Sequence, residues 1–211
     1  MYRPPAFRED RRDVLDALIR AHPLATLVTA GAHGLMANLI PFTLDATRGA
    51  HGVLRAHLAR GNDQLVELGA VDEALVIFQG PETYITPSWY ASKAEHGRVV
   101  PTWNYAIVQA WGRPQVIDDP AWLRVQIEEL TRAQEERRTK PWHVSDAPEA
   151  FIQSQVKGIV GLEIPISRIE GKWKVSQNRP MADREGVVTG LLSEGQSADM
   201  ARIVAERAAE K

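Results

Sequence analysis

The polar side chains at and just beyond residues 53–58 are of types that bind anions. Apolar residues alternate there with Arg55 and His57, which predicts a strand with an apolar inner side and with Arg55 and His57 facing outward. Three further polar residues follow where this strand ends, namely Arg60, Asn62 and Gln64. A guanidinium, amide side chains and free backbone N–H groups together favour an anion site. The solvated surface of a barrel explains the same exposed charges, so the residue chemistry alone leaves both interpretations open.

A second polar cluster lies in residues 172–179. Strand periodicity places Lys174, Ser176 and Asn178 on one face. Donors this close together suit a phosphate or the polar edge of a ring. The alternative is an edge strand on which lysine prevents unwanted pairing.

Aromatic residues form a third cluster. Trp103 and Tyr105 flank Asn104, and Trp89 with Tyr90 lies upstream. Such side chains stack on flat ligands or gather at subunit interfaces, and they also fill ordinary cores.

Composition excludes several kinds of chemistry. The 211 residues include no cysteine, which rules out disulfides, iron–sulfur clusters and thiol nucleophiles. The formal net charge of −2 provides no field that would attract nucleic acid or anionic lipid. The chain lacks the glycine-rich nucleotide motifs, a nucleophile elbow and metal-ligand histidine spacing. It also has no signal-like start and no long apolar run, so we expect no membrane association and a cytoplasmic location.

The elements that must position these clusters follow from periodicity and from turn residues. Helices are predicted over residues 10–22, 63–68, 121–137 and 148–156, with a tail from residue 182 in two helical pieces broken near Gly195. Strands are predicted over residues 24–30, 35–45, 53–58, 74–79, 83–86, 103–117 and 159–169, with a hairpin turn at Glu170-Gly171 into a last strand over 172–176. Because helices do not alternate with strands, the pattern predicts an α+β fold with a closed or partly closed, mostly antiparallel barrel.

Six motifs, in order along almost the whole chain, resemble the PaiB-like family of FMN-binding negative transcriptional regulators. They are Met1-Tyr2-Arg3-Pro4-Pro5-Ala6-Phe7, His57-Leu58-Ala59-Arg60-Gly61-Asn62, Phe78-Gln79-Gly80-Pro81, Pro87-Ser88-Trp89-Tyr90, Pro101-Thr102-Trp103-Asn104-Tyr105 and Lys174-Val175-Ser176-Gln177-Asn178-Arg179. The resemblance implies a split β-barrel of the pyridoxamine-phosphate oxidase type, a homodimer, and FMN in a cleft between subunits. The expected organisation is an FMN-binding domain over residues 1–180 and a helical extension over 181–211 packed on it.

The resemblance also implies which residues contact FMN. A phosphate-proximal set comprises His57, Arg60, Asn62 and Gln64, and a second set comprises Trp103, Asn104, Lys174, Ser176, Gln177 and Asn178. Asn38 stands where a histidine is expected, and Arg55 where a small residue is commoner. Neither a metal nor a catalytic side chain is implied.

Three functions remain open at this point. The first is a PaiB-type regulator or flavin sensor, in which the near-neutral charge argues against direct DNA binding. The second is a flavin-dependent oxidoreductase on the same fold, in which the cofactor itself would carry the redox chemistry. The third is a haem-binding split barrel with His22, His57 or His143 as the axial ligand.

Overall fold

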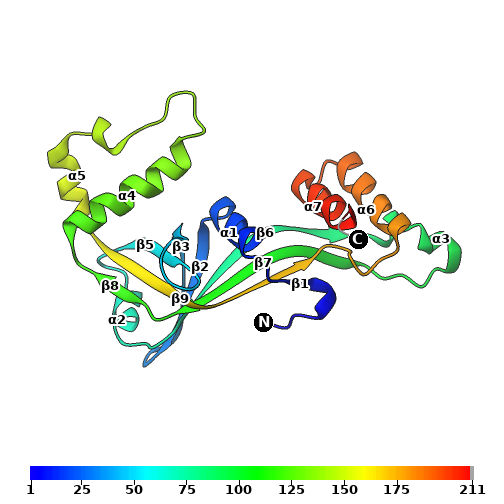
Figure 1. Ribbon diagram of the computed structural model, residues 1–211, viewed down its shortest axis with the longest axis horizontal. Coiled ribbons are helices and arrows are strands. Elements are labelled where there is room, and N and C mark those ends of the chain that lie inside the picture. Colours follow the sequence, from blue (N-terminus) through cyan, green and yellow to red (C-terminus); the bar gives the residue numbers. More distant parts are fainter. Residues whose placement is uncertain (210–211) are drawn as a thin grey trace. The chain divides into compact units, whose positions relative to one another are not determined.

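The computed structural model describes residues 1–209, which form nine strands and seven α-helices (Figure 1). The strands are β1 (Arg8–Glu9), β2 (Leu24–Gly31), β3 (Gly34–Pro41), β4 (Thr43–Asp45), β5 (Val53–Ala59), β6 (Ala74–Ile85), β7 (Thr102–Gly112), β8 (Gln115–Ile117) and β9 (Ile159–Lys174). The helices are α1 (Arg12–Ala21), α2 (Gln64–Leu68), α3 (Ser92–His96), α4 (Pro120–Glu135), α5 (Glu149–Val156), α6 (Met181–Ser193) and α7 (Ala198–Ala209). None of the described helices is long and apolar enough to cross a bilayer.

The strands form one sheet in the order β3-β2-β6-β7-β9-β5-β4, with β1 and β8 also paired to β9. The pairs β2–β3, β2–β6, β4–β5, β5–β9, β1–β9 and β8–β9 are all antiparallel. The α+β, mostly antiparallel prediction is confirmed. In the described residues the sheet does not close, because its path ends at β3 and at β4.

The chain divides into two compact units, and β6, β7 and β9 each contribute residues to both. Unit 1 contains Met1–Leu15, Gln79–Val108 and the chain from Glu170 onward, whereas unit 2 contains Asp16–Phe78 and Gln109–Ile169.

Unit 2 has two apolar clusters. Phe42 and Phe78 pack edge to face, with ring centroids 6.1 Å apart, and both are buried, as are residues of β2, β5 and β9 such as Leu27, Leu54 and Leu162. The second cluster lies around α4 and α5, which pack together in Figure 1, and contains Leu123, Val144, Ile152 and Val156. The second cluster fixes α4 and α5 within unit 2 by burying their apolar sides.

In unit 1 the first strand and the last helix meet. Glu9 on β1 is 2% exposed and forms ion pairs with Arg11 and with Arg207 of α7. The arginines hold the pKa of this carboxyl below its usual range even though burial acts to raise it. Helices α6 and α7 lie side by side (Figure 1) and bury apolar residues such as Val187, Leu191 and Met200.

Local signals predicted the helix ends well. Asp119 caps α4 by accepting a hydrogen bond from the Ala121 N–H at 2.9 Å, and Pro120 occupies the first helical position. The tail is two helices with Gly195 at φ +62° between them, as predicted.

Several strand predictions need correction. The strands predicted over 74–79 and 83–86 are one strand, β6, and the strand predicted over 103–117 is interrupted at Arg113 and Pro114, between β7 and β8. The single strand predicted over 35–45 is two strands, β3 and β4, because Phe42 turns inward and its N–H donates to Pro23 O at 2.8 Å. The hairpin predicted at Glu170-Gly171 is wrong, since β9 runs without a break to Lys174. Gly171 is needed inside that strand because a Cβ there would lie 2.3 Å from Leu15 Cδ2 and 2.8 Å from Glu9 O.

Candidate functional site

Arg55 and His57 both contact helix α4, so the interpretation of this side of β5 as a solvated surface is wrong. Arg55 is only 8% exposed and is paired with Glu129 of α4 and with Glu163 of β9, its Nε lying 3.2 Å from Glu163 Oε1. Its guanidinium lies 4.9 Å from the centroid of the Trp122 ring, also on α4. Helix α4 therefore covers the strand face that alternation alone assigned to water.

His57 also contacts α4. Its Nδ1 is 2.7 Å from Oε1 of Gln126, a residue with no exposed surface. The Gln126 Nε2 amide is buried and has no hydrogen-bond partner among the described residues. His57 is half-buried, so the structure places it between β5 and α4.

Arg60 follows directly after β5, and all three of its guanidinium nitrogens donate hydrogen bonds within the protein. Its Nη1 and Nη2 donate to the two carboxylate oxygens of Asp118 at 3.0 and 2.6 Å. Its Nε and Nη2 also donate to the carbonyls of Lys157 and Ile159, both at 3.2 Å. The hydrogen bond from Arg60 lowers the pKa of Asp118. A phosphate would have to replace Asp118 to bind this guanidinium.

Asn62 and Gln64 organise the start of α2. Asn62 Oδ1 accepts a hydrogen bond from the Gln64 N–H at 3.0 Å. Gln64 is fully buried, and its Nε2 donates to Leu27 O and to Thr29 Oγ1 at 3.1 and 3.2 Å. Its Oε1 accepts from Asn38 at 2.9 Å, so the residue that departs from the family pattern is the partner of Gln64. Gln64 faces the sheet interior.

In unit 1 the second predicted set surrounds the end of β9. Asn104 is 1% exposed and donates to Ser176 Oγ at 2.9 Å. Ser176 has φ +66°, a left-handed conformation uncommon for residues other than glycine. Gln177 folds back on the chain, with its Oε1 accepting from the Val175 N–H and its Nε2 donating to Trp173 O. Asn178 is exposed.

Lys174 provides the positive charge of this cluster. Its Nζ donates to Thr102 Oγ1 and to Trp103 O, which are neutral acceptors. Burial, and then the charges of Lys172 and Arg179, lower the pKa of Lys174. Within the described part of the chain no carboxylate pairs with it, so an anion arriving here would relieve repulsion between cations.

Two exposed aromatic residues lie in the same unit, and one of them, Trp103, contacts Lys174 through its backbone carbonyl. Trp103, whose carbonyl accepts from Lys174, is 54% exposed, and Tyr84 is 42% exposed. Their ring centroids are 6.0 Å apart in an edge-to-face arrangement. Trp103 also lines a cavity of about 230 Å³ with Gln79, Glu82 and Tyr105. A flat aromatic group would find stacking partners on this surface.

Two residues of α6 that support this region, Arg184 and Gly190, were not predicted from the sequence. Arg184 of α6 is 3% exposed and donates to the carbonyls of Gln177 and Arg179, at 3.0 and 2.8 Å, which fixes the loop after β9. Trp89, considered above as a stacking residue, donates from its Nε1 to Glu194 Oε1 at 2.9 Å. A Cβ at Gly190 of α6 would lie within 2.5 Å of the Trp89 ring, so this tryptophan packs on a helix. Nothing in the sequence pattern of this helix indicates that Arg184 contacts the loop after β9 or that Gly190 contacts Trp89.

The ten predicted residues therefore form two sets. His57, Arg60, Asn62 and Gln64 lie in unit 2, and the other six lie in unit 1. Within unit 1 the structure brings Trp103, Asn104, Lys174 and Ser176 into contact through hydrogen bonds. Within unit 2 it links Asn62 to Gln64, while His57 and Arg60 have separate partners.

The open, mostly antiparallel sheet is that of a split barrel, and the family comparison makes the protein one of the flavin-binding type. Residues 1–168 match the family model described as a putative FMN-binding domain. The chain belongs to this PaiB-like family, and FMN is its cofactor.

Relatives cover nearly the whole chain. An uncharacterized protein of Emericella nidulans is 38% identical over 98% of this chain and 97% of its own length. The Bacillus subtilis protein named "Protease synthase and sporulation protein PAI 2" is 29% identical over 92% of this chain and 90% of its own. The structure of an FAD and heme binding protein from Mycobacterium smegmatis has a TM-score of 0.58 at 18% identity, covering 79% of this chain and 73% of that one. This last likeness shows the shared fold.

The residues of unit 1 fit FMN. The cofactor combines a phosphate with a flat ring system, and unit 1 offers the ammonium of Lys174, bonded to the backbone of Trp103, and the exposed ring pair of Trp103 and Tyr84. The buried Arg184 adds a positive charge, and its Nη1 has no hydrogen-bond partner in the described residues. In unit 2, Arg60 has suitable chemistry, but Asp118 occupies its two terminal nitrogens.

Proposed function

We propose that this protein is a homodimeric FMN-binding regulator of the PaiB type that senses flavin. The observation that carries the proposal is Lys174, an ammonium with neutral partners and a lowered pKa, on a surface with exposed aromatic rings. When bound, FMN would supply redox chemistry and a visible absorbance, while the chain would bind and orient it.

In this proposal Lys174 contacts an anionic part of FMN and Trp103 stacks on its ring. Asn104, Ser176, Gln177 and Asn178 shape the surrounding loop. His57, Arg60, Asn62 and Gln64 form the phosphate-proximal set, in which Arg60 must exchange Asp118 for the phosphate. We assign the flavin domain to residues 1–180 and the packed helical extension to 181–211, of which 210 and 211 lie outside the described residues.

Lys174→Met is expected to weaken FMN binding by about tenfold or more, because a hydrogen bond to a charged group is worth about 1.5–3 kcal/mol. The measurement is fluorescence titration of FMN into the apoprotein. Lys140→Met removes an exposed lysine in unit 2 and is the control. Arg60→Ala tests the phosphate-proximal set separately. Unchanged FMN affinity in the Lys174→Met protein would refute the assignment of Lys174.

The homodimer is supported by an apolar sheet face in unit 2. Leu35 and Leu39 on β3 are 80% and 64% exposed, and Leu24 on β2 is 57% exposed. The register places all three on one side, since Leu24 opposes Pro41 and Thr26 opposes Leu39. Contiguous exposed leucines of this kind are typical of protein interfaces. A second copy of the chain would bury this face.

Leu39→Arg should convert a dimer into monomers, because burying an unpaired guanidinium in an apolar interface is strongly unfavourable. Sedimentation velocity provides the measurement. Leu192→Arg changes an exposed leucine on α6 and serves as the control. A Leu39→Arg protein that sediments like wild type would place the interface elsewhere.

The regulatory role is supported by similarity to the named Bacillus subtilis protein. Because the net charge of the protein is −2, we expect it to regulate through a partner protein or a local basic patch and not through an extensive DNA contact. The cytoplasmic location stays a prediction. Transcript profiles of a deletion strain that expresses either wild-type or Lys174→Met protein test this role. Identical profiles with and without the gene would exclude regulation.

A further inference from the structure

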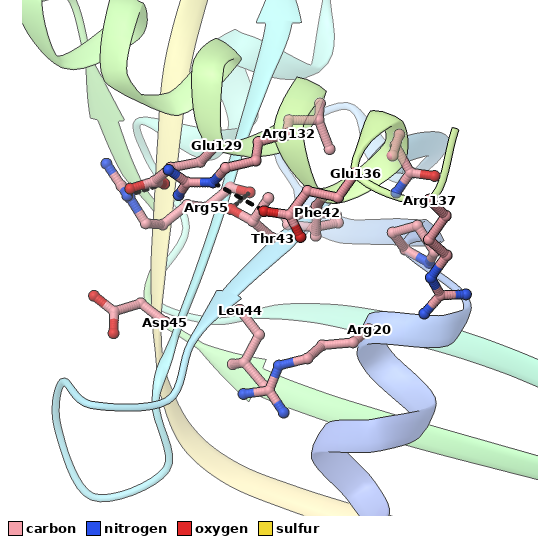
Figure 2. Close-up of a pocket in the computed structure, with 14 residues that line it drawn as sticks. Arg20, Phe42, Thr43, Leu44, Asp45, Arg55, Glu129, Arg132, Glu136 and Arg137 are labelled. Carbon is pink, nitrogen blue, oxygen red and sulfur yellow. Dashed lines mark hydrogen bonds and ion pairs between the residues drawn. The ribbon is translucent and has the colours of Figure 1, made fainter. Parts of the chain in front are cut away.

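Unit 2 contains a cavity of about 540 Å³ that none of the ten predicted flavin residues lines. It lies among the end of α1, strand β4 and the last turns of α4 (Figure 2). Its volume is in the range of about 300–1,000 Å³ that is typical of small-molecule sites. Phe42, Leu44 and Leu130 give it apolar walls.

Positive charge at the cavity is not balanced by its acidic residues. Arg20, at the end of α1, and Arg137, just beyond α4, are exposed and form no ion pair among the described residues. Arg132 pairs with Glu136 at 3.8 Å, its one ion pair within residues 1–209, and both of these side chains are two-thirds exposed. Figure 2 shows the Arg20 guanidinium near Leu44, with Arg132 and Glu136 drawn along α4.

The other charges that line the cavity are already satisfied. Arg55 and Glu129 pair with each other. Asp45 accepts hydrogen bonds from the Thr47 N–H and Oγ1 at 3.0 and 2.7 Å, which lower its pKa. The groups left to recognise a ligand are therefore guanidiniums next to an apolar wall.

We propose that this cavity binds a small organic anion, with its carboxylate or phosphate held by Arg20 and its apolar body against Leu44 and Leu130, while Arg137 adds positive charge at the other side of the opening. Arginine suits the head group because its planar fork of donors matches the oxygens of carboxylates and phosphates. The walls suit the body because burying apolar surface is favourable and leaves no polar group unpaired. The proposal does not depend on the proposed flavin function, since the two involve different residues.

The experiment is isothermal titration of the full-length protein with octanoate, with octanol and with inorganic phosphate. We expect octanoate to bind more tightly than either control, because it alone has both the charge and the apolar body. Arg20→Gln/Arg137→Gln should weaken octanoate binding about tenfold or more, as expected for loss of charge-assisted contacts. Arg113→Gln is the matched control, since Arg113 is exposed in unit 2 and does not line the cavity.

Several results would overturn the proposal. Equal binding of octanol and octanoate would mean that the arginines contribute nothing, and equal octanoate binding by the double variant would place the site elsewhere. Both arginines are exposed, so an unchanged urea midpoint is expected and separates lost binding from lost folding. An FMN affinity that falls in parallel with octanoate binding would show that the cavity belongs to the flavin site and is not a separate one.

Discussion

Replacing Glu163 with glutamine is expected to lower the free energy of unfolding by about 3 kcal/mol, because it removes the counter-charge shared by the buried Arg55 and the half-exposed Arg48. Glu163 is 5% exposed and accepts two hydrogen bonds from Arg48, at 2.7 and 2.9 Å. It also pairs with Arg55 and accepts from Trp122 Nε1 at 3.2 Å. Urea unfolding followed by tryptophan fluorescence measures the loss.

The contribution of the Glu163 carboxylate should also appear as a loss of stability when the wild-type protein is acidified. The hydrogen bonds from Arg48 hold the pKa of Glu163 below its usual value of 4.5. A carboxyl with a lowered folded-state pKa stabilises the fold above about pH 4.5, and this contribution is lost as the pH falls through the lower value. The Glu163→Gln protein should therefore lose less stability on acidification. Glu82→Gln, on an exposed site, is the control, and equal acid sensitivity of wild type and Glu163→Gln would contradict the assignment.

Gly112→Ala is expected to cost about 3 kcal/mol, since overpacking a close backbone contact forces the strands apart. A Cβ at Gly112 would lie 2.1 Å from Pro165 O and 2.8 Å from Ile164 Cγ2. A backbone carbonyl inside a paired strand cannot rotate away as a side chain can. Equilibrium unfolding in urea measures the change.

Gly61→Ala is the matched control for this substitution. A Cβ at Gly61 meets no atom within 4 Å in the described residues, so that change should alter stability little. Equal stabilities of the two alanine variants would show that β7 and β9 can separate near Gly112 at low cost.

The sequence predicted local structure better than it predicted contacts between distant segments. Alternation identified β5, and the Asp119-Pro120 pair marked the start of α4, because both signals come from neighbouring residues. Alternation also showed that one side of β5 is apolar, but it carries no information on what covers the other side. Glu129, which pairs with Arg55, is 74 residues away along the chain.

The candidate site shows the same limit. Motif order assigned Lys174 and Asn104 to one site. In the structure Lys174 of β9 donates to Trp103 O of β7, and Asn104 of β7 donates to Ser176, just after β9. The motifs did not predict that Asp118 would engage Arg60, since a motif specifies a residue type and not its partner. Nor did they predict the full burial of Gln64, which depends on the sheet that α2 packs against.

The ion pair between Glu9 and Arg207 bears on where this protein can be shortened. A chain truncated after residue 180 would lack Arg207 and leave the nearly inaccessible Glu9 with Arg11 as its remaining cation. It would also lack Arg184, which holds the carbonyls of Gln177 and Arg179. Domain boundaries for expression or crystallisation should therefore keep the last two helices with the strand that begins the fold, because their arginines complete it.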